Sequence, residues 1–456
     1  MTPMREAFDL IIRGDVVTAE TVIGDAFVAV RGGTIAQVGS GSPPGAAKVE
    51  DHRGALLFPG LIDAQVHAGS YEGVAGLRDA TRAAAAGGVT TIVDMPFDEP
   101  QPVNDVGLFD AKVAKLRELA AVDVALYVTA RKDRNYAPLA RLADRGACGV
   151  KLSTYEYHPV RFPRFDTGEM FEIFQEAARL GLPVAFHNED QGLVDHFLKK
   201  VLDRGDRSPA AHGASRPPMA ELVADAQILE LAAATGVRCH IVHSSLAAGC
   251  AIARHYRQRG ARVSVESCLQ YLIFNEDDVL EQGAFLRQNP PLRSATERHA
   301  LWESLERGEV DLLSTDHVAW PVHRKSDPDI FKNGAGVPGL ETLLPVFYTA
   351  LIERKLSPSI VARVCARNPA QHFGFARKGE IRAGADADIA VLRPGATTFD
   401  QARMISSVKW SPYHGRALAG QVAATYLRGR KVFAEGDVLA QSGYGEFVRP
   451  ERLSLP

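Results

Sequence analysis

The sequence has no apolar run that is long enough to cross a lipid bilayer. A membrane-spanning helix needs about 20 consecutive apolar residues, and no stretch of the 456 residues reaches that length. Residues 1–17 carry charges within their apolar part and lack a cleavage site of small residues, so they do not resemble a secretory signal peptide. We therefore expect a cytoplasmic protein that has no membrane partner.

Cysteine is also scarce. The five cysteines are an odd number, are scattered along the chain and form no Cys-x-x-Cys pair. This pattern favours reduced thiols over a disulfide framework and agrees with a cytoplasmic location. The cysteines are Cys148, Cys239, Cys250, Cys268 and Cys365.

No cluster of positive charge marks a surface for nucleic acid. The chain has 52 basic and 55 acidic residues, a net charge of −3, and no Lys/Arg run that stands out. Nucleic acid is therefore not an expected partner. The fractions of hydrophobic residues (46%) and charged residues (23%) are those of an ordinary globular protein, and we find no internal repeat and no low-complexity segment.

Both ends of the chain have the pattern of short strands separated by turns. Before residue 58, apolar and polar residues alternate in segments that glycine-rich turns interrupt, and after about residue 374 short strands return. We expect the two ends to pair into one small β-sandwich domain made of residues 1–58 and 375–456. The strand candidates are residues 8–13, 26–31, 34–38, 389–392, 422–427 and 431–433.

Between residues 59 and 374, strands alternate with helices. Eight apolar runs have the length of buried strands, and helical segments separate most of them. Eight parallel strands with helices between them make an α/β fold of the closed β/α (TIM) barrel type. The strand candidates begin at residues 61, 89, 122, 149, 183, 238, 262 and 310.

Polar side chains follow five of these eight strand candidates. Asp63, Gln65 and His67 alternate along the first one, so in an extended chain they point to the same side. Because the active groups of such barrels lie at the C-terminal ends of the strands, we expect these side chains in one site. Histidines, a carboxylate and a lysine together suggest a metal centre. The candidates are Gln65, His67, Lys151, His187, His243 and Asp316.

Lys151 is the unexpected member of this set. Its apolar neighbours predict burial, which is costly for an ammonium group. Such a lysine must lose its charge, find a partner or be modified, and carboxylation by CO2 would turn it into an anionic oxygen ligand. The residues alone leave two alternatives open, namely that Lys151 extends to solvent or that it pairs with Asp316.

Residues 58–67 read Phe-Pro-Gly-Leu-Ile-Asp-Ala-Gln-Val-His. This segment resembles the metal-binding segment Pro-Gly-x-Ile-Asp-x-His-x-His of the amidohydrolase superfamily, and within that superfamily the chain resembles the cyclic-amide hydrolases hydantoinase, dihydropyrimidinase, allantoinase and dihydroorotase. The resemblance covers nearly the whole chain and implies an enzyme with a β/α barrel. The other segments that carry it are residues 81–96, 266–271, 289–293, 314–317, 336–341 and 411–415.

The resemblance implies a centre of two divalent metal ions, commonly zinc. Lys151 matches the family's carboxylated lysine, which bridges the two ions. His187 and His243 match the ligands of one metal, whereas His67, Asp316 and the position of Gln65 match those of the other. A metal-bound hydroxide would attack the ring carbonyl, and Asp316 would act as the general base that later protonates the leaving nitrogen. The family also implies a homo-oligomer, specifically a tetramer.

Gln65 departs from the family pattern, which has histidine at this position. Because a glutamine amide oxygen is neutral and a weaker zinc ligand than imidazole, we expect the second metal to be weak or exchangeable, giving one or two ions per chain. Two alternatives stay open. One is a catalytically inactive scaffold that resembles the collapsin-response-mediator relatives of dihydropyrimidinase, and the other is a single-metal hydrolase of a different amide, lactam or imide.

The substrate-binding candidates are Tyr155, Asn289 and Gly336. The family has a tyrosine shortly after the lysine, and both Tyr155 and Tyr157 lie near that place without matching its offset. Asn289 stands where the family often has serine, and Ala335 replaces the asparagine that precedes Gly-x-Pro-Gly. We expect backbone groups near Asn289 and Gly336 to bind the amide edge of a ring.

Two further arginines, Arg161 and Arg164, lie in the loop that follows these tyrosines. In that loop they could meet an anionic substrate, although surface arginines more often have no such role. The sequence as a whole leads us to expect a metal-dependent hydrolase. Its small-molecule substrate would be a cyclic amide or ureide such as allantoin, a hydantoin or a dihydropyrimidine.

Overall fold

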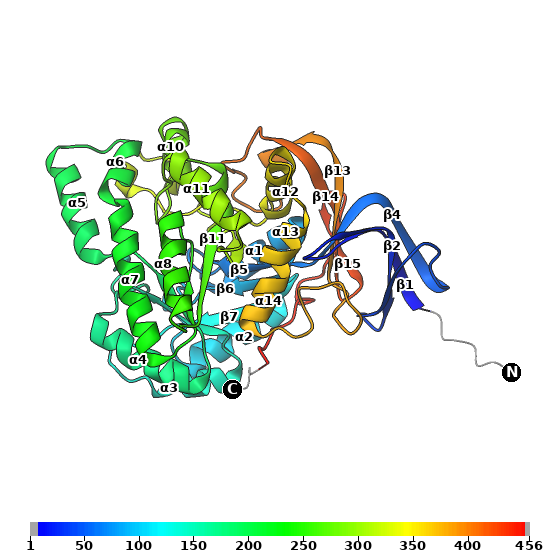
Figure 1. The fold of residues 1–456 in the computed structure, drawn as a ribbon, viewed down its shortest axis with the longest axis horizontal. Coiled ribbons are helices and arrows are strands. Elements are labelled where there is room, and N and C mark those ends of the chain that lie inside the picture. The colour runs from blue at the N-terminus through cyan, green and yellow to red at the C-terminus, as the bar shows by residue number, and fades with distance from the viewer. Residues whose placement is uncertain (1–7, 452–456) are drawn as a thin grey trace.

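The computed structural model describes residues 8–451, and the larger part of it is a β/α barrel (Figure 1). Eight strands lie side by side in sequence order, and each parallel pair joins neighbours in the chain. A parallel bridge joins Val66 of the first strand to His317, which follows the last strand by three residues. The predicted barrel is thereby confirmed. Its strands are β5 (Leu61–Val66), β6 (Val89–Asp94), β7 (Asp123–Val128), β8 (Gly149–Ser153), β9 (Val184–His187), β10 (Cys239–Ile241), β11 (Val263–Cys268) and β12 (Leu312–Ser314).

Helices surround the barrel strands (Figure 1). Helix α4 (Thr167–Leu180) shows how the sequence sets their ends. It begins at a capping box between Asp166 and Glu169 and ends at Gly181, whose φ of 70° suits glycine. The other helices between barrel strands include α1 (Gly76–Ala86), α2 (Val106–Leu119), α3 (Ala137–Arg145), α7 (Pro218–Thr235), α8 (Ala247–Gln258) and α11 (Ala295–Glu306).

Some helices were not expected from the sequence. Helices α5 (Gln191–Asp203) and α6 (Pro209–Ser215) follow β9 and project from the end of the barrel farthest from the second sheet (Figure 1). Shorter or later helices are α9 (Leu269–Ile273), α10 (Glu276–Gln282), α12 (Leu343–Glu353), α13 (Ser359–Ala362) and α14 (Asn368–Phe373). Within residues 8–451, no helix has both the length and the apolar character needed to span a membrane.

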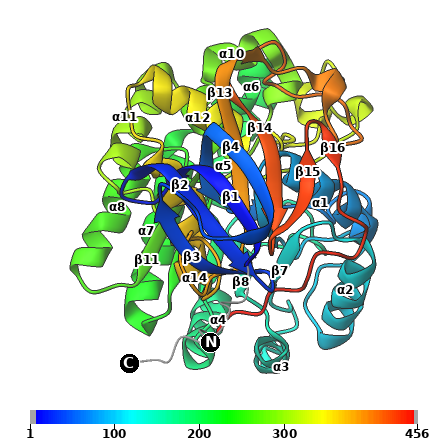
Figure 2. The ribbon, with the colours of Figure 1, turned by 90° about the vertical axis from the view of Figure 1, so that its right-hand side faces the viewer.

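The second sheet combines strands from both ends of the chain (Figure 2). The N-terminal and C-terminal strands meet where β4 pairs with β13. The predicted union of the two termini in one β unit is confirmed, whereas the domain boundaries at residues 58 and 375 stay a prediction. The strand order is β16 (Asp437–Val438), β15 (Arg430–Ala434), β14 (Ala417–Leu427), β13 (Ile389–Thr398), β4 (Ala46–Pro59), β1 (Phe8–Val17), β2 (Val22–Arg31) and β3 (Thr34–Ser40).

Strand β4 was missed by the sequence analysis. Its first nine residues are largely exposed and carry several charges, so they lack the apolar alternation of a half-buried strand. Tertiary pairing nevertheless holds this segment, because β1 pairs with it, while β13 pairs with the last four residues of β4. The last residues of β4 are buried, and the chain passes through Gly60 directly into barrel strand β5.

A buried ionic network joins the barrel to the second sheet. Asp123 at the start of β7 accepts hydrogen bonds from Lys378 at 2.8 Å and from Arg428 at 2.7 Å. Lys378 also donates to Asp388 at 2.8 Å, and the backbone amide of Arg428 donates to the same carboxylate. Residues from distant parts of the chain therefore depend on one another for charge compensation.

Candidate active site

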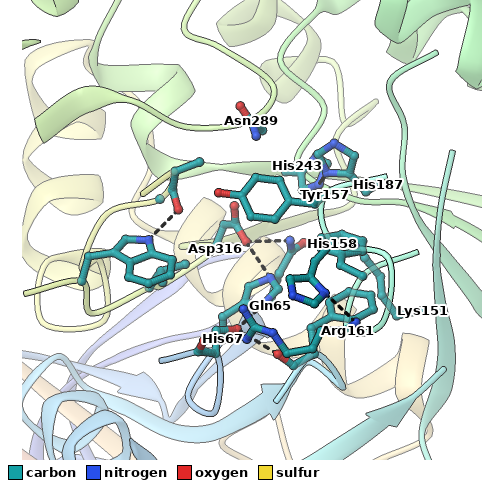
Figure 3. Close-up of a pocket in the computed structure, with 17 residues that line it drawn as sticks. Gln65, His67, Lys151, Tyr157, His158, Arg161, His187, His243, Asn289 and Asp316 are labelled. Carbon is teal, nitrogen blue, oxygen red and sulfur yellow. Dashed lines mark hydrogen bonds and ion pairs between the residues drawn. The ribbon is translucent and has the colours of Figure 1, made fainter. Parts of the chain in front are cut away.

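A cavity opens at the C-terminal ends of the barrel strands (Figure 3). The predicted metal-site residues all line it, together with two of the three predicted substrate-binding residues. Its remaining lining is mostly aromatic or apolar. The lining residues are Gln65, His67, Ser70, Phe97, Lys151, Tyr157, His158, Arg161, Phe162, His187, His243, Asn289, Asp316, Val318, Trp320, Ala335 and Gly336.

His187 and His243 form one pair of potential ligands. Nδ1 of His187 lies 3.0 Å from Nε2 of His243, and Nε2 of His187 lies 2.8 Å from the carboxylate of Glu189. A carboxylate at Nε2 favours the tautomer in which that nitrogen carries the proton. Nδ1 then offers its lone pair to the cavity, which suits the binding of a cation.

Glu189 is fully buried and holds its charge through two partners. Burial opposes ionisation, but Arg216 and His187 outweigh it and lower the pKa of Glu189 to about 2. Arg216 makes a short ion pair with the same carboxylate oxygen that contacts His187. The sequence analysis missed Glu189, although its position two residues after His187 is a signal for a side chain on the same side of an extended segment.

Asp316 is the centre of a second group. Its Oδ1 accepts a hydrogen bond from the side-chain amide of Gln65 at 2.8 Å and lies 3.3 Å from Nε2 of His67. Burial favours the neutral acid, but His67, Lys151 and Gln65 outweigh this effect and lower the pKa of Asp316. Asp316 is therefore a carboxylate at neutral pH.

Gln65 faces Asp316 with the nitrogen of its amide. The amide oxygen is buried and has no hydrogen-bond partner. If the amide were turned round, its oxygen would face the ionised carboxylate oxygen of Asp316, which is unfavourable. The hydrogen bond therefore decides which end of the Gln65 amide is the nitrogen. The position that the family uses for a ligand thus presents a hydrogen-bond donor to Asp316.

Lys151 lies within the barrel strand β8 and is 1% exposed. Its Nζ has no hydrogen-bond partner, and burial lowers its pKa to about 7. The two alternatives of solvent exposure and direct pairing with Asp316 are therefore wrong. An uncharged amine is the form that reacts with CO2, so the environment of Lys151 suits carboxylation.

The donor set fits a metal only with Lys151 included. Within residues 8–451, no three His, Cys, Asp or Glu side chains gather closely enough to hold an ion by themselves. They occur instead as the pair His187 and His243 and the pair His67 and Asp316. A carboxylated Lys151 would supply an oxygen ligand to each pair. The buried amine of Lys151 has no hydrogen-bond partner of its own, which favours this modification.

Backbone strain is concentrated at two of these residues. His243 has a φ of 41° and Asp316 a φ of 49°, values in the left-handed region that residues other than glycine seldom adopt. His243 lies two residues after the end of β10, and Asp316 lies two residues after the end of β12. Such strain persists where the surrounding structure enforces it and is typical of functional sites.

The substrate-binding candidates have different positions. Tyr157 lines the cavity, whereas Tyr155 does not, because the guanidinium of Arg216 covers its ring at 4.5 Å. Asn289 lines the cavity and its Oδ1 has no partner. Gly336 also lines it, but its amide donates to another backbone carbonyl, and its own carbonyl accepts from Lys325.

Two further histidines, His240 and His317, are not among the potential metal ligands. His240 is buried, as expected of a core residue, between Ser264 and Glu266. His317 is also buried and does not line this cavity, since its Nδ1 accepts from the amides of Gly339 and Leu340.

Comparisons with known proteins cover this whole region. A family model described as the amidohydrolase family matches residues 56–432. The chain is 38% identical to an allantoinase from Rubrobacter xylanophilus over 98% of both chains. It is 32% identical to an L-hydantoinase from Paenarthrobacter aurescens, over 97% of this chain and 98% of that one. The solved L-hydantoinase (dihydropyrimidinase) from Arthrobacter aurescens has a TM-score of 0.92 and 31% identity, covering 97% of this chain and 100% of that chain.

Proposed function

The chain belongs to the amidohydrolase family, and from that premise we propose that it opens the ring of a cyclic ureide, with allantoin as the first substrate to test. The observation that carries this proposal is the similarity to an allantoinase over 98% of both chains. The cavity supports it, because polar strand-end residues lie beside aromatic walls that suit a small ring. Hydantoin is the second candidate, since L-hydantoinases match almost as much of the chain.

The residues fit a resident divalent metal, which we propose to be zinc. His187 and His243 would hold one ion, and carboxylated Lys151 would contribute an oxygen. When bound, such an ion lowers the pKa of a water molecule and polarises a carbonyl group. The Glu189 carboxylate keeps His187 in the tautomer that ligation needs, because it accepts a hydrogen bond from the protonated Nε2.

Asp316 is the proposed general base. It would take the proton of the attacking water and return it to the leaving ring nitrogen. Its lowered pKa keeps it ionised and ready to accept a proton at neutral pH. Because Gln65 and His67 both contact Oδ1, the orientation of the carboxylate is fixed before the substrate arrives.

Gln65 bears on the number of metal ions. The atom of Gln65 that can ligate a metal is its neutral amide oxygen, a weaker ligand than imidazole, while its nitrogen is held by the hydrogen bond to Asp316. We therefore propose one tightly held ion per chain and a weak second site. Metal content by mass spectrometry, on protein purified without chelator, tests this directly. We expect one ion in the native chain and two in Gln65→His, whereas two tightly held ions in the native chain would contradict the proposal.

A substrate panel tests the function. The protein, supplied with zinc and bicarbonate, would be incubated with allantoin, hydantoin, dihydrouracil, a lactam and an imide, and ring opening followed by NMR. We expect allantoin to be opened fastest. Opening of only the lactam or imide would favour the different-amide alternative, and no reaction in metal-loaded protein would favour the scaffold. The scaffold is not favoured at present, because Asp316 is held ionised among potential metal ligands.

We propose in addition that the protein is a cytoplasmic homotetramer. The proposal comes from the family and makes no use of a surface in the single chain. Light scattering coupled to gel filtration measures the mass of the assembly, which should be about four times the 49.3 kDa of one chain.

A further inference from the structure

A tight turn places Arg161 on the wall of the cavity. The amide of Phe162 donates to the carbonyl of His158 at 2.9 Å, and the amide of Arg161 donates to Nδ1 of His158 at 3.2 Å. The ring of Phe162 stacks on Phe97 with centroids 3.8 Å apart, which anchors the turn on the opposite loop. In Figure 3, Arg161 and His67 lie on the side of the cavity opposite Asn289.

The guanidinium of Arg161 is only partly used within the protein. One terminal nitrogen donates to the carbonyl of Ser70 at 3.0 Å and pairs with Glu99 at 2.9 Å. The Nε–H group is buried and has no partner. A buried N–H without a partner is unfavourable, so an acceptor on a bound molecule would be stabilised here.

The carboxylate of Glu99 lies beside the Arg161 guanidinium, so a hydrogen-bond acceptor stands next to the donor. Glu99 does not itself line the cavity, but its carboxylate pairs with Arg161, which does. The Glu99 side chain is about half exposed at 50%, against 19% for Arg161, so the carboxylate still has room for another partner. The amide of Glu99 donates to the carbonyl of Gly69 at 2.9 Å, and a Cβ at Gly69 would lie 2.0 Å from the Asp98 carboxylate. The loop that carries Glu99 is therefore held closely against the loop that follows His67.

We propose that Arg161 and Glu99 recognise a neutral substituent on the substrate ring that contains both a carbonyl and an N–H group, such as a ureido or carboxamide group. The assignment rests on the proposed function, in which the cleaved amide lies among the potential metal ligands. Ser70 links the two regions, because its Oγ lies 3.2 Å from Nδ1 of His67 while its carbonyl accepts from Arg161. His67 and Arg161 are thus joined through a single residue, and both line the same cavity.

The same pair discriminates by charge. A ureido carbonyl accepts from Arg161, and its N–H groups donate to Glu99. A carboxylate would also accept from Arg161, but it would meet the like charge of Glu99. The cavity therefore selects allantoin, which bears a ureido group, over hydantoin-5-acetate, which bears a carboxylate, and over unsubstituted hydantoin.

The test compares Arg161→Met with Arg164→Met, a matched change at an exposed arginine of the same loop. The Michaelis constant of Arg161→Met for allantoin should rise by about tenfold to a hundredfold, since a hydrogen bond to a charged group is lost. The Michaelis constant of Arg161→Met for hydantoin should change by less than about twofold. If hydantoin binds without turnover, its inhibition constant is measured in place of the Michaelis constant. Arg164→Met should match the native protein with both compounds.

A second variant tests the role of charge. Glu99→Gln removes the negative charge with little change of shape and should improve kcat/KM for hydantoin-5-acetate about tenfold relative to allantoin. Thermal melting and metal content would verify that each variant is folded and loaded. Equal effects of Arg161→Met on allantoin and hydantoin, or no gain in Glu99→Gln, would overturn the assignment alone. A native protein that opens neither ring would overturn the proposed function, and this assignment with it.

Discussion

At the scale of single residues, the burial of Lys151 lowers the stability of the folded chain but suits its proposed role as a metal ligand. Its amine is buried without a partner, and burial lowers its pKa to about 7. In the unfolded chain the proton is held up to a pH of about 10.4. Between these values the unfolded state binds more protons, so the free energy of unfolding of the metal-free, unmodified protein rises with pH. Below pH 7 both states bind the proton, and the full cost of burying the ammonium group is present.

Replacing Lys151 by methionine should therefore stabilise the metal-free protein at low pH. We expect Lys151→Met to increase the free energy of unfolding at pH 6 by about 1–3 kcal/mol, the cost of a buried unpaired polar group, and to gain less at pH 9. Urea unfolding of chelator-treated proteins measures this. Lys199→Met, at an exposed lysine, serves as the control, and a destabilised Lys151→Met at pH 6 would contradict the account.

At the scale of structural elements, Lys325 joins two segments of the cavity wall. Its buried Nζ donates to the carbonyls of Arg287, Gly334 and Gly336 at 3.2, 2.9 and 2.9 Å. Burial lowers the pKa of Lys325 well below its ordinary value. The three carbonyls around Nζ match the three N–H groups of an ammonium group, whereas a neutral amine has only two. The segment before Asn289 and the segment that contains Gly336 are thereby held together.

Removal of this link should loosen the wall. Lys325→Met leaves buried carbonyls without a donor and should lower the free energy of unfolding by about 2–3 kcal/mol. The Michaelis constant should rise more than kcat falls, because the metal ligands lie on other elements. Steady-state kinetics and urea unfolding measure both effects, and Lys332→Met, at an exposed lysine nearby, is the matched control. If Lys325→Met were less stable but had an unchanged Michaelis constant, Lys325 would stabilise the fold without helping to shape the cavity.

At the scale of the whole molecule, the network around Asp123 unites the barrel and the second sheet. Asp123→Ala would leave Lys378 and Arg428 with less compensation in a buried region, since Lys378 would keep only Asp388 and the more distant Asp386. We expect a loss of about 3–5 kcal/mol in the free energy of unfolding. Denaturant unfolding measures the loss. Lys199→Ala breaks only an exposed ion pair and should change stability by less than about 0.5 kcal/mol.

Much of the architecture could be predicted from the sequence because local signals specify it. Apolar runs of strand length and the helices between them were sufficient for the barrel, and polar residues at strand ends were sufficient to identify the six predicted metal-site residues that line the cavity. Gln65, Lys151 and Asp316 indeed line one cavity, although their roles stay proposals. Strand β4 was missed because its pairing with β1 and β13, and no local alternation, determines its structure.

Other features could not be predicted because they join residues that are distant in the sequence. Arg161 and Glu99 meet only when two loops pack together, and Arg216 reaches Glu189 only across the barrel end. The position of Tyr155 beneath Arg216 depends on the same packing, so the choice between Tyr155 and Tyr157 required the structure.

The decisive experiment is the opening of allantoin by the native protein and by Asp316→Asn, each with its metal content determined on the same preparation. We expect turnover by the native protein and a loss of about a hundredfold to ten-thousandfold in kcat for Asp316→Asn, the contribution of a positioned general base. The ion held by His187 and His243 should remain in the variant. An inert native protein at full metal loading, or an Asp316→Asn variant as active as the native protein, would contradict this expectation.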